Sequence, residues 1–171
     1  MPRGGTRRIG DAEHADLLEI VNAAAEAYRG VIPADRWREP YMDAAELDRE
    51  VAAGVAFCGL DAGGRLAGVM GIQPVGDVDL IRHAYVRPEQ QGDGIGRRLL
   101  EDLTARAERP LLVGTWAAAQ WAIRFYERNG FELVAPAEMY RLLTTYWDIP
   151  ERQVETSVVL AQRPVARRKP D

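Results

Sequence analysis

The sequence predicts one α/β domain with its elements in the order β-α-α-β-β-β-α-β-α-β-α-β. The 171 residues are enough for a single domain with its own core, and 47% hydrophobic with 28% charged residues is ordinary globular composition. Apolar residues recur at helical spacing in some segments and form short runs between glycines or prolines in others. Glycine-containing turns separate three consecutive strand candidates in the middle of the chain. This order indicates a meander that leads into one or two crossover units.

The first half of the chain predicts a short strand, two helices and the meander. A strand at residues 6–9 precedes a helix at residues 12–28, for which Asp11 is the expected N-cap. A second helix covers residues 43–53, and the irregular segment 31–42 between the helices is of a kind that often carries binding residues. The meander consists of strands at residues 55–60, 65–73 and 78–86.

The second half predicts alternating helices and strands. They are a helix at 96–108, a strand at 111–115, a helix at 118–128, a strand at 131–134, a helix at 137–146 and a last strand at 156–160. We expect the core to span about residues 7–160, followed by a charged, flexible tail at about 163–171.

Composition excludes several classes of function. A formal net charge of −4 argues against broad nucleic-acid binding, which needs a basic surface. The single cysteine, Cys58, cannot form an internal disulfide and is expected to be a buried thiol; no Cys/His cluster has metal-ligand spacing, so no metal site is expected. No apolar stretch is long enough for a membrane span or a signal peptide, so a cytoplasmic location is expected.

Three alternating glycines mark the most informative segment. Gly92, Gly94 and Gly96 lie between the third meander strand and the following helix. Glycine lets the backbone turn tightly and approach a ligand closely. The first amides of a helix lack intrahelical partners and lie at the positive end of its dipole. A phosphate or pyrophosphate fits this arrangement, and a tight turn without a ligand is the alternative.

Two familiar nucleotide-binding patterns do not fit the segment. The G-x-G-x-x-G fingerprint reaches Arg97 when it starts at Gly92, and Leu99 when it starts at Gly94, where glycine is required. A P-loop needs a lysine, and residues 86–100 contain none. Both nucleotide interpretations are therefore weakened.

Two motifs instead resemble the GNAT superfamily of N-acetyltransferases. Residues 91–96, QGDGIG, match the Q/R-x-x-G-x-G/A pattern of that family and follow a strand that ends in Tyr85-Val86-x-Pro88. Residues 122–131, AIRFYERNGF, resemble its second motif, A-x-x-F-Y-x-x-x-G-F. The order of elements is also similar, so the resemblance covers about residues 7–160. It implies a single acetyltransferase domain with a mixed, mostly antiparallel central sheet, splayed middle strands and flanking helices.

The resemblance also implies acetyl-CoA as cofactor, bound in a gap between the strands at 78–86 and 111–115. Its pantetheine would pair with the strand backbone as an added strand does, and an N–H near Ala84 would polarise the thioester carbonyl. The pyrophosphate would lie on the amides of the glycine-rich turn. The implied cofactor residues are Ala84, Tyr85, Val86, Gln91, Gly92, Asp93, Gly94, Ile95, Gly96 and Arg97.

Catalytic roles follow less directly from the resemblance. Tyr126 matches the tyrosine that protonates the departing thiolate in many family members, with a core aromatic as the alternative. The position of the family's strand glutamate is occupied by Leu80, so His83 and Asp79 are the nearest candidates for a general base. An ordered water could take the place of the general base, and a substrate amine that is already partly deprotonated would not need one. Ala119 stands where many members have a cofactor-contacting asparagine, a contact that Gln120 could replace.

The acceptor is expected to be a primary amine of a small molecule or peptide. In the family its pocket lies between the first two helices and before the last strand, which implies Tyr28, Trp37, Glu39, Tyr41 and Trp147 here. Aromatic rings beside acidic residues would suit a cationic amine, and a packed aromatic cluster is the alternative. A homodimer is possible. The rival functions are an acyl-CoA sensor without turnover and an unrelated phosphate-binding module.

Overall fold

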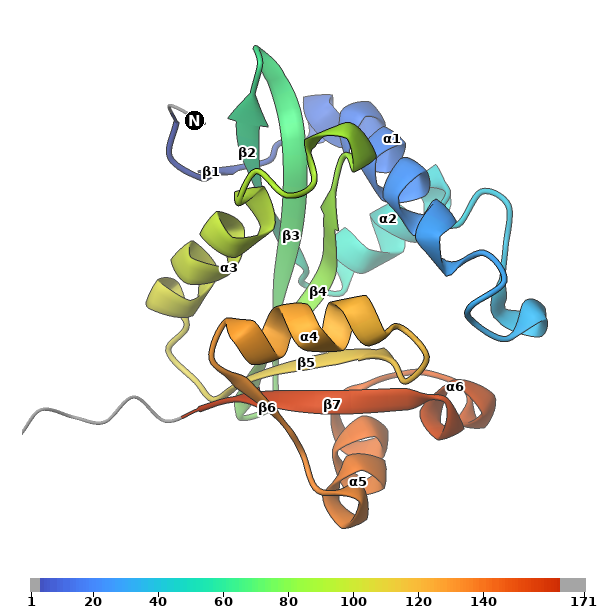
Figure 1. Cartoon of the computed structure of the whole chain (residues 1–171). Coiled ribbons are helices and arrows are strands. Elements are labelled where there is room, and N and C mark those ends of the chain that lie inside the picture. The colour runs from blue at the N-terminus through green and yellow to red at the C-terminus, as the bar shows by residue number, and fades with distance from the viewer. Residues whose placement is uncertain (1–3, 164–171) are drawn as a thin grey trace, which may run out of the picture.

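The computed structural model describes residues 4–163 and contains a seven-stranded sheet in the order β1-β2-β3-β4-β5-β7-β6 (Figure 1). The strands are β1 (Arg7–Arg8), β2 (Ala56–Ala62), β3 (Arg65–Val75), β4 (Val78–Val86), β5 (Leu111–Trp116), β6 (Phe131–Leu133) and β7 (Ser157–Gln162). Neighbouring strands are antiparallel except β4 and β5, which are parallel. The predicted mixed, mostly antiparallel sheet is confirmed. The predicted charged tail lies, apart from Arg163, outside the described residues.

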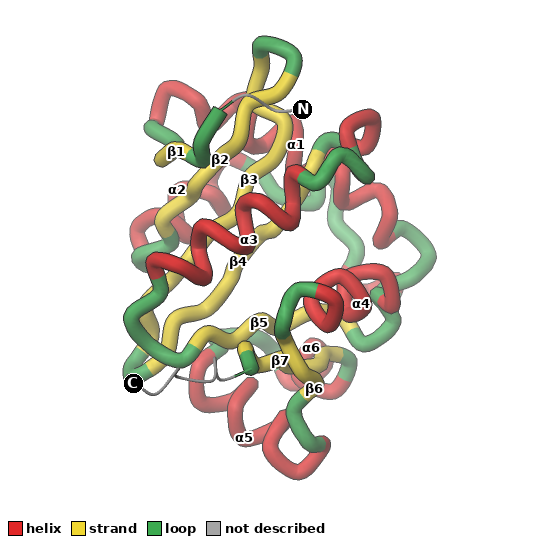
Figure 2. The backbone as a smooth tube through the Cα atoms, turned by 60° about the vertical axis from the view of Figure 1, so that its left-hand side comes forward, coloured by secondary structure: helices red, strands yellow, loops and turns green. Residues whose placement is uncertain are grey.

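Six α-helices cover the two faces of this sheet among the described residues. They are α1 (His14–Ala25), α2 (Ala44–Ala52), α3 (Ile95–Arg106), α4 (Gln120–Arg128), α5 (Pro136–Tyr146) and α6 (Glu151–Glu155). Figure 2 shows α3 and α4 on the same side, one over each half of the sheet. The other face carries α1 and α2 over one half and α5 and α6 over the other.

Strand alternation accounts for this division, because successive side chains point to opposite faces. On β4, Leu80 packs with Leu143 of α5, whereas the next residue, Ile81, packs with α3 and α4. On β3, Val69 packs with α1 and α2, whereas Met70 packs with α3. The apolar runs of the meander are therefore strands buried on both faces.

The central feature of the sheet is the separation of β4 from β5. These strands pair only from Asp79 to Ile81, opposite Leu111 to Val113. Beyond that point β4 continues along β3 to Val86, while β5 continues along β7 to Trp116. The two strands thus diverge, and the sheet opens between them (Figure 2).

The start of α1 and the presence of a short helix, α6, differ from the sequence prediction. Asp11 is not the N-cap of α1: it begins a short 3-10 turn, and α1 starts at His14. The cause is Glu13, whose carboxylate accepts bonds from the Arg7 guanidinium and the Gly10 amide and so fixes the turn before the helix. Helix α6 was not predicted, because its five residues are too few for a periodic signal.

Within residues 4–163, no helix is both long and apolar enough to cross a bilayer.

Candidate active site

A cleft of about 720 Å³ occupies the opening between β4 and β5. Its walls come from β4, β5, the glycine-rich turn, the start of α3, one side of α4 and the segments around Tyr28 and Tyr41. The cleft therefore brings together residues separated by most of the chain length. The cleft exists because β4 and β5 separate; if the two strands had continued to pair, the sheet would be closed at this point.

The glycine-rich turn forms one end of the cleft. Gly94 is the N-cap of α3, with φ of 80° in the left-handed region, and it makes no side-chain cap bond. The first backbone bond of the helix runs from the Arg98 amide to the Gly94 carbonyl at 3.1 Å. The amides of Ile95, Gly96 and Arg97 therefore have no acceptor within the helix and are available to an anion.

The space around this turn is also open. A Cβ added to Gly92 or Gly94 would meet no heavy atom within 4 Å. Gln91, Gly92, Gly94, Ile95, Gly96 and Arg97 all line the cleft, whereas Asp93 is not among the lining residues. Gln91 donates from Nε2 to the Val86 carbonyl at 3.2 Å, which ties the turn to the end of β4. The turn thus fits a diphosphate without any side chain having to move.

One polar atom on the cleft wall lacks a partner. Within residues 4–163, the buried side-chain oxygen without a hydrogen bond is Oε1 of Gln90, a residue for which the sequence suggested no role. Its Nε2 donates to the Ala62 carbonyl at 3.4 Å. Buried acceptors in folded proteins normally have donors, and this oxygen is an exception.

The middle of β4 carries a bulge that faces the cleft. Arg82 pairs with Gly71 and Tyr85 with Val69, so three steps on β4 lie opposite two on β3. The extra residue falls at His83, which has φ of 53° and is the one non-glycine residue in the described chain with positive φ. Such a conformation costs of order 1 kcal/mol or more and is found preferentially at functional sites. A bulge leaves backbone groups outside the ladder, and here they lie in the cleft wall beside Ala84.

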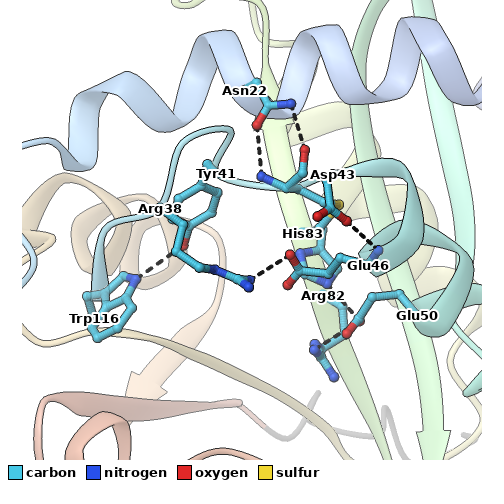
Figure 3. A network of polar contacts seen from close by, with 10 residues as sticks. Asn22, Arg38, Tyr41, Asp43, Glu46, Glu50, Arg82, His83 and Trp116 are labelled. Atoms are coloured by element: carbon cyan, nitrogen blue, oxygen red, sulfur yellow. Dashed lines mark hydrogen bonds and ion pairs between the residues drawn. The ribbon is translucent and has the colours of Figure 1, made fainter. Parts of the chain in front are cut away.

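His83 is held by a carboxylate from a different element. Its Nε2 lies 2.8 Å from Oε2 of Glu50 on α2, and Arg82 reaches the same oxygen at 3.0 Å (Figure 3). Burial alone would raise the pKa of Glu50, but the His83 hydrogen bond and the charges of His83, Arg82 and Arg49 outweigh it and lower that pKa. An ionised Glu50 only accepts hydrogen bonds, so Nε2 of His83 donates to it and Nδ1 is the ring nitrogen left for another partner.

Tyr126 lies in the cleft lining and is 5% exposed. Its ring packs edge-on against Phe125 at 5.1 Å and Phe131 at 5.7 Å between ring centroids. Burial, with a smaller contribution from the Tyr28 phenol, raises the pKa of Tyr126. The phenol is therefore protonated throughout the neutral range and can donate a proton. Tyr126 is thus a core aromatic that also borders the cleft.

Two other residues considered from sequence do not face the cleft. Asp79 is 6% exposed and lies in the paired part of β4, where it lines a separate small cavity together with Cys58. Its position gives it no access to a group held in the cleft. Gln120 donates to the Ala117 carbonyl at 3.1 Å and is not part of the lining, so it does not replace the missing asparagine.

The expected acceptor residues divide into two groups. Tyr28, Tyr41 and Trp147 line the cleft, whereas Trp37 and Glu39 lie behind it. Arg29 stacks 4.6 Å above the Trp37 ring and donates to Glu39, so this acid is already paired. Glu39 does lie beside an aromatic ring, since it accepts from Nε1 of Trp37 at 3.3 Å, but neither residue lines the cleft.

Several lining residues had no signal in the sequence. Trp116 at the end of β5 and Trp121 on α4 border the cleft, and Glu50 stands behind its His83. Trp121 lies 5.6 Å from the Tyr28 ring, and Tyr28 lies 5.7 Å from the Tyr41 ring. A helical residue such as Glu50 is indistinguishable from a solvated one until α2 is placed against β4.

An uncapped helix start, parted strands and a buried phenol together fit an extended, diphosphate-bearing thioester. The comparisons with known proteins agree. The acetyltransferase (GNAT) domain family matches residues 53–133, which include both motifs. The match supports the resemblance inferred from the two motifs, and over those residues the chain is similar to the acetyltransferase (GNAT) domain.

Solved structures share the fold at low sequence identity. PaiA N-acetyltransferase from Thermoplasma acidophilum in complex with coenzyme A is 17% identical, with TM-score 0.68 over 93% of this chain and 98% of that one. A ribosomal-protein-alanine N-acetyltransferase from Brucella melitensis is 20% identical, with TM-score 0.62 over 94% and 99%. A GNAT acetyltransferase from Elizabethkingia anophelis with acetyl-CoA bound is 18% identical, with TM-score 0.55 over 72% and 84%. Among curated protein sequences, none matches the chain significantly.

Proposed function

We propose that the protein is an acetyl-CoA-dependent N-acetyltransferase that acts on a primary amine of a small molecule or peptide. The observation that carries this proposal is the continuity of one cleft. It begins at the uncapped amides of α3, runs along the bulged part of β4 and reaches the Tyr126 phenol. Acetyl-CoA has its parts in the matching order: a diphosphate at one end, peptide-like amides in the middle and a reactive thioester at the other end.

The residues of the cleft fit acetyl-CoA from end to end. The amides of Ile95, Gly96 and Arg97 would hold the pyrophosphate at the positive end of α3. The open edge of β4 near Ala84 and Val86 would pair with the pantetheine amides. Acetyl-CoA supplies an acetyl group already activated as a thioester.

The bulge and Tyr126 would then serve the transfer. A backbone N–H near Ala84, freed from the ladder by the bulge, is suited to stabilise charge that develops on the carbonyl oxygen. Tyr126, kept protonated by its raised pKa, would donate to the departing sulfur. His83, through Nδ1, would accept a proton from the amine, unless an ordered water does so or the amine arrives neutral.

Two measurements on the purified chain test this function. Calorimetric titration with acetyl-CoA tests binding, and release of free thiol in the presence of diamines, arylalkylamines, peptides and aminoglycosides tests transfer. The proposal expects binding together with amine-dependent thiol release. Binding without release to any amine would favour an acyl-CoA sensor, and absence of binding would remove both functions.

A further inference from the structure

The acceptor end of the cleft is distinguished by the charges that line it. Among the described residues that form the cleft wall, none is an aspartate, a glutamate or a lysine. The charged groups in the wall are the guanidinium groups of Arg82 and Arg97 and, when protonated, His83. A ligand with several positive charges would therefore meet like charge and no carboxylate directly in the wall.

Four acids near this end of the molecule are engaged elsewhere, and Asp148, next to the lining residue Trp147, is exposed and outside the wall. Glu39 pairs with Arg29 at 2.9 Å, and Asp35 lies 3.5 Å from Arg152. Glu46 pairs with Arg38 at 2.7 Å, and Glu50 stands behind His83 and Arg82 (Figure 3). Each of these four paired carboxylates has a cationic partner of its own. Recruiting one to a second cation would break an existing ion pair.

Five aromatic rings form a second feature of the wall. Tyr28, Tyr41, Tyr85, Trp116 and Trp121 come from five different segments and all border the cleft. The Tyr28 ring lies 5.6 Å from Trp121, 5.7 Å from Tyr41 and 6.4 Å edge-on to Tyr85. These separations are those of rings that already pack favourably, and a further flat ring extends such a stack.

Two phenols in this wall, those of Tyr28 and Tyr85, are uncharged at any physiological pH. Burial, together with the neighbouring Tyr41, raises the pKa of Tyr28 to about 12. Burial and the neighbouring phenols raise the pKa of Tyr85 well above its ordinary value. The wall is thus an apolar surface with hydroxyl groups and does not supply a negative charge.

From this wall we propose that the acceptor is a primary amine carried on an aromatic skeleton with no second positive charge. The inference rests on the proposed function and specifies its substrate class. The ring would lie among Tyr28, Tyr41 and Trp116, with the amine near His83 and Ala84. A low-polarity site without a counter-charge lowers the pKa of a bound ammonium group, which favours the neutral, nucleophilic amine.

The transfer balances with the groups present. The bound ammonium first loses one proton to solvent or His83, and the neutral nitrogen then forms a bond to the acetyl carbon. The carbon–sulfur bond breaks, and the sulfur takes the Tyr126 proton. The nitrogen loses a second proton, and Tyr126 is reprotonated by solvent. The products are the N-acetylated arylalkylamine, free coenzyme A and one proton.

The test compares amines of matched length with the intact enzyme. Values of kcat/KM are measured by thiol release for 2-phenylethylamine, its ring-saturated analogue 2-cyclohexylethylamine, 1,6-diaminohexane and a short peptide with a free N-terminus. We expect 2-phenylethylamine to exceed both the diamine and the peptide by at least about tenfold, since two favourable ring contacts correspond to about that ratio. A higher value for the diamine or the peptide would overturn the substrate class and leave the proposed function standing.

Three variants sharpen the assignment. Tyr41→Leu should lower kcat/KM for 2-phenylethylamine several-fold, and Tyr140→Leu, at a tyrosine that is 57% exposed on α5 and outside the cleft wall, is the matched control. Ala27→Glu adds a carboxylate to the exposed rim of the wall and should shift preference toward 1,6-diaminohexane. Unchanged preference in both Tyr41→Leu and Ala27→Glu would overturn the inference.

Acetyl-CoA affinity, measured by calorimetry in each variant, reports separately on the proposed function. Loss of transfer to every amine in the unaltered enzyme would overturn both.

Discussion

Substitution of Gly94 by aspartate, compared with asparagine, tests the anion site at the start of α3. Both side chains have the same shape, and both must adopt φ of 80°, which costs roughly 1 kcal/mol relative to glycine. Nothing lies within 4 Å of the added Cβ, so neither variant introduces a clash. The difference between the two variants is therefore one negative charge.

The size of that difference follows from Coulomb's law. A carboxylate about 5–6 Å from one phosphate charge, at an effective dielectric constant of about 20, weakens binding by about 3 kcal/mol. Gly94→Asp should thus bind acetyl-CoA about 100-fold more weakly than Gly94→Asn. The same charge lies at the positive end of α3, so the thermal midpoint of the aspartate variant should equal or exceed that of the asparagine variant.

Calorimetry at low salt and thermal unfolding, on the same two preparations, measure these quantities. We expect the aspartate variant to bind acetyl-CoA more weakly but to unfold at an equal or higher temperature. A weaker affinity therefore reports on the anion site and not on unfolding of the protein. Equal acetyl-CoA affinities for the aspartate and asparagine variants would refute the placement of a diphosphate on these amides.

Three further predictions address the transfer and the fold. Tyr126→Phe should lower kcat by about 100-fold while the acetyl-CoA dissociation constant stays unchanged, and equal turnover would remove the proton-donor role. The pKa of Glu50 is lowered from 4.5 in the folded protein, so its ionised form contributes stability above that value and the contribution is lost as pH falls below it. Glu50→Gln should accordingly be less stable than the parent at pH 7, in chemical denaturation, by a margin that narrows at pH 4; a constant margin would contradict this. Leu17→Ala should cost about 2–5 kcal/mol of unfolding free energy, because Leu17 is fully buried between α1 and the sheet, and a cost below about 1 kcal/mol would show that this contact is not part of the core.

Local pattern predicted most of the secondary structure. The strand at residues 78–86 was located to the residue, and the glycine stop after Asn129 agrees with the end of α4. These signals are local, since periodicity, glycine and proline act within a few residues. The start of α1 was missed because Glu13 bonds to Arg7, and the five-residue α6 was missed because it is too short for a period.

The site was predictable only where it is built from contiguous residues. The glycine-rich turn is one short segment, and its conformation follows from residues that tolerate positive φ. Asp79 and His83 are both on β4, and the sequence makes both of them candidates for the general base. The structure places only His83 at the bulge and in the cleft, because Asp79 lies where β4 still pairs with β5.

Patterns in the sequence predict the order of elements, the helix start that can hold an anion and the family that the two motifs resemble. These properties depend on backbone preferences and on spacing within single segments. Only the tertiary structure shows where β4 and β5 part, which acids are paired and which aromatic rings share a wall. Those features depend on contacts such as Glu50 with His83 and Tyr28 with Trp121, between residues far apart in the chain. Only the packed fold brings such residues within reach of one another.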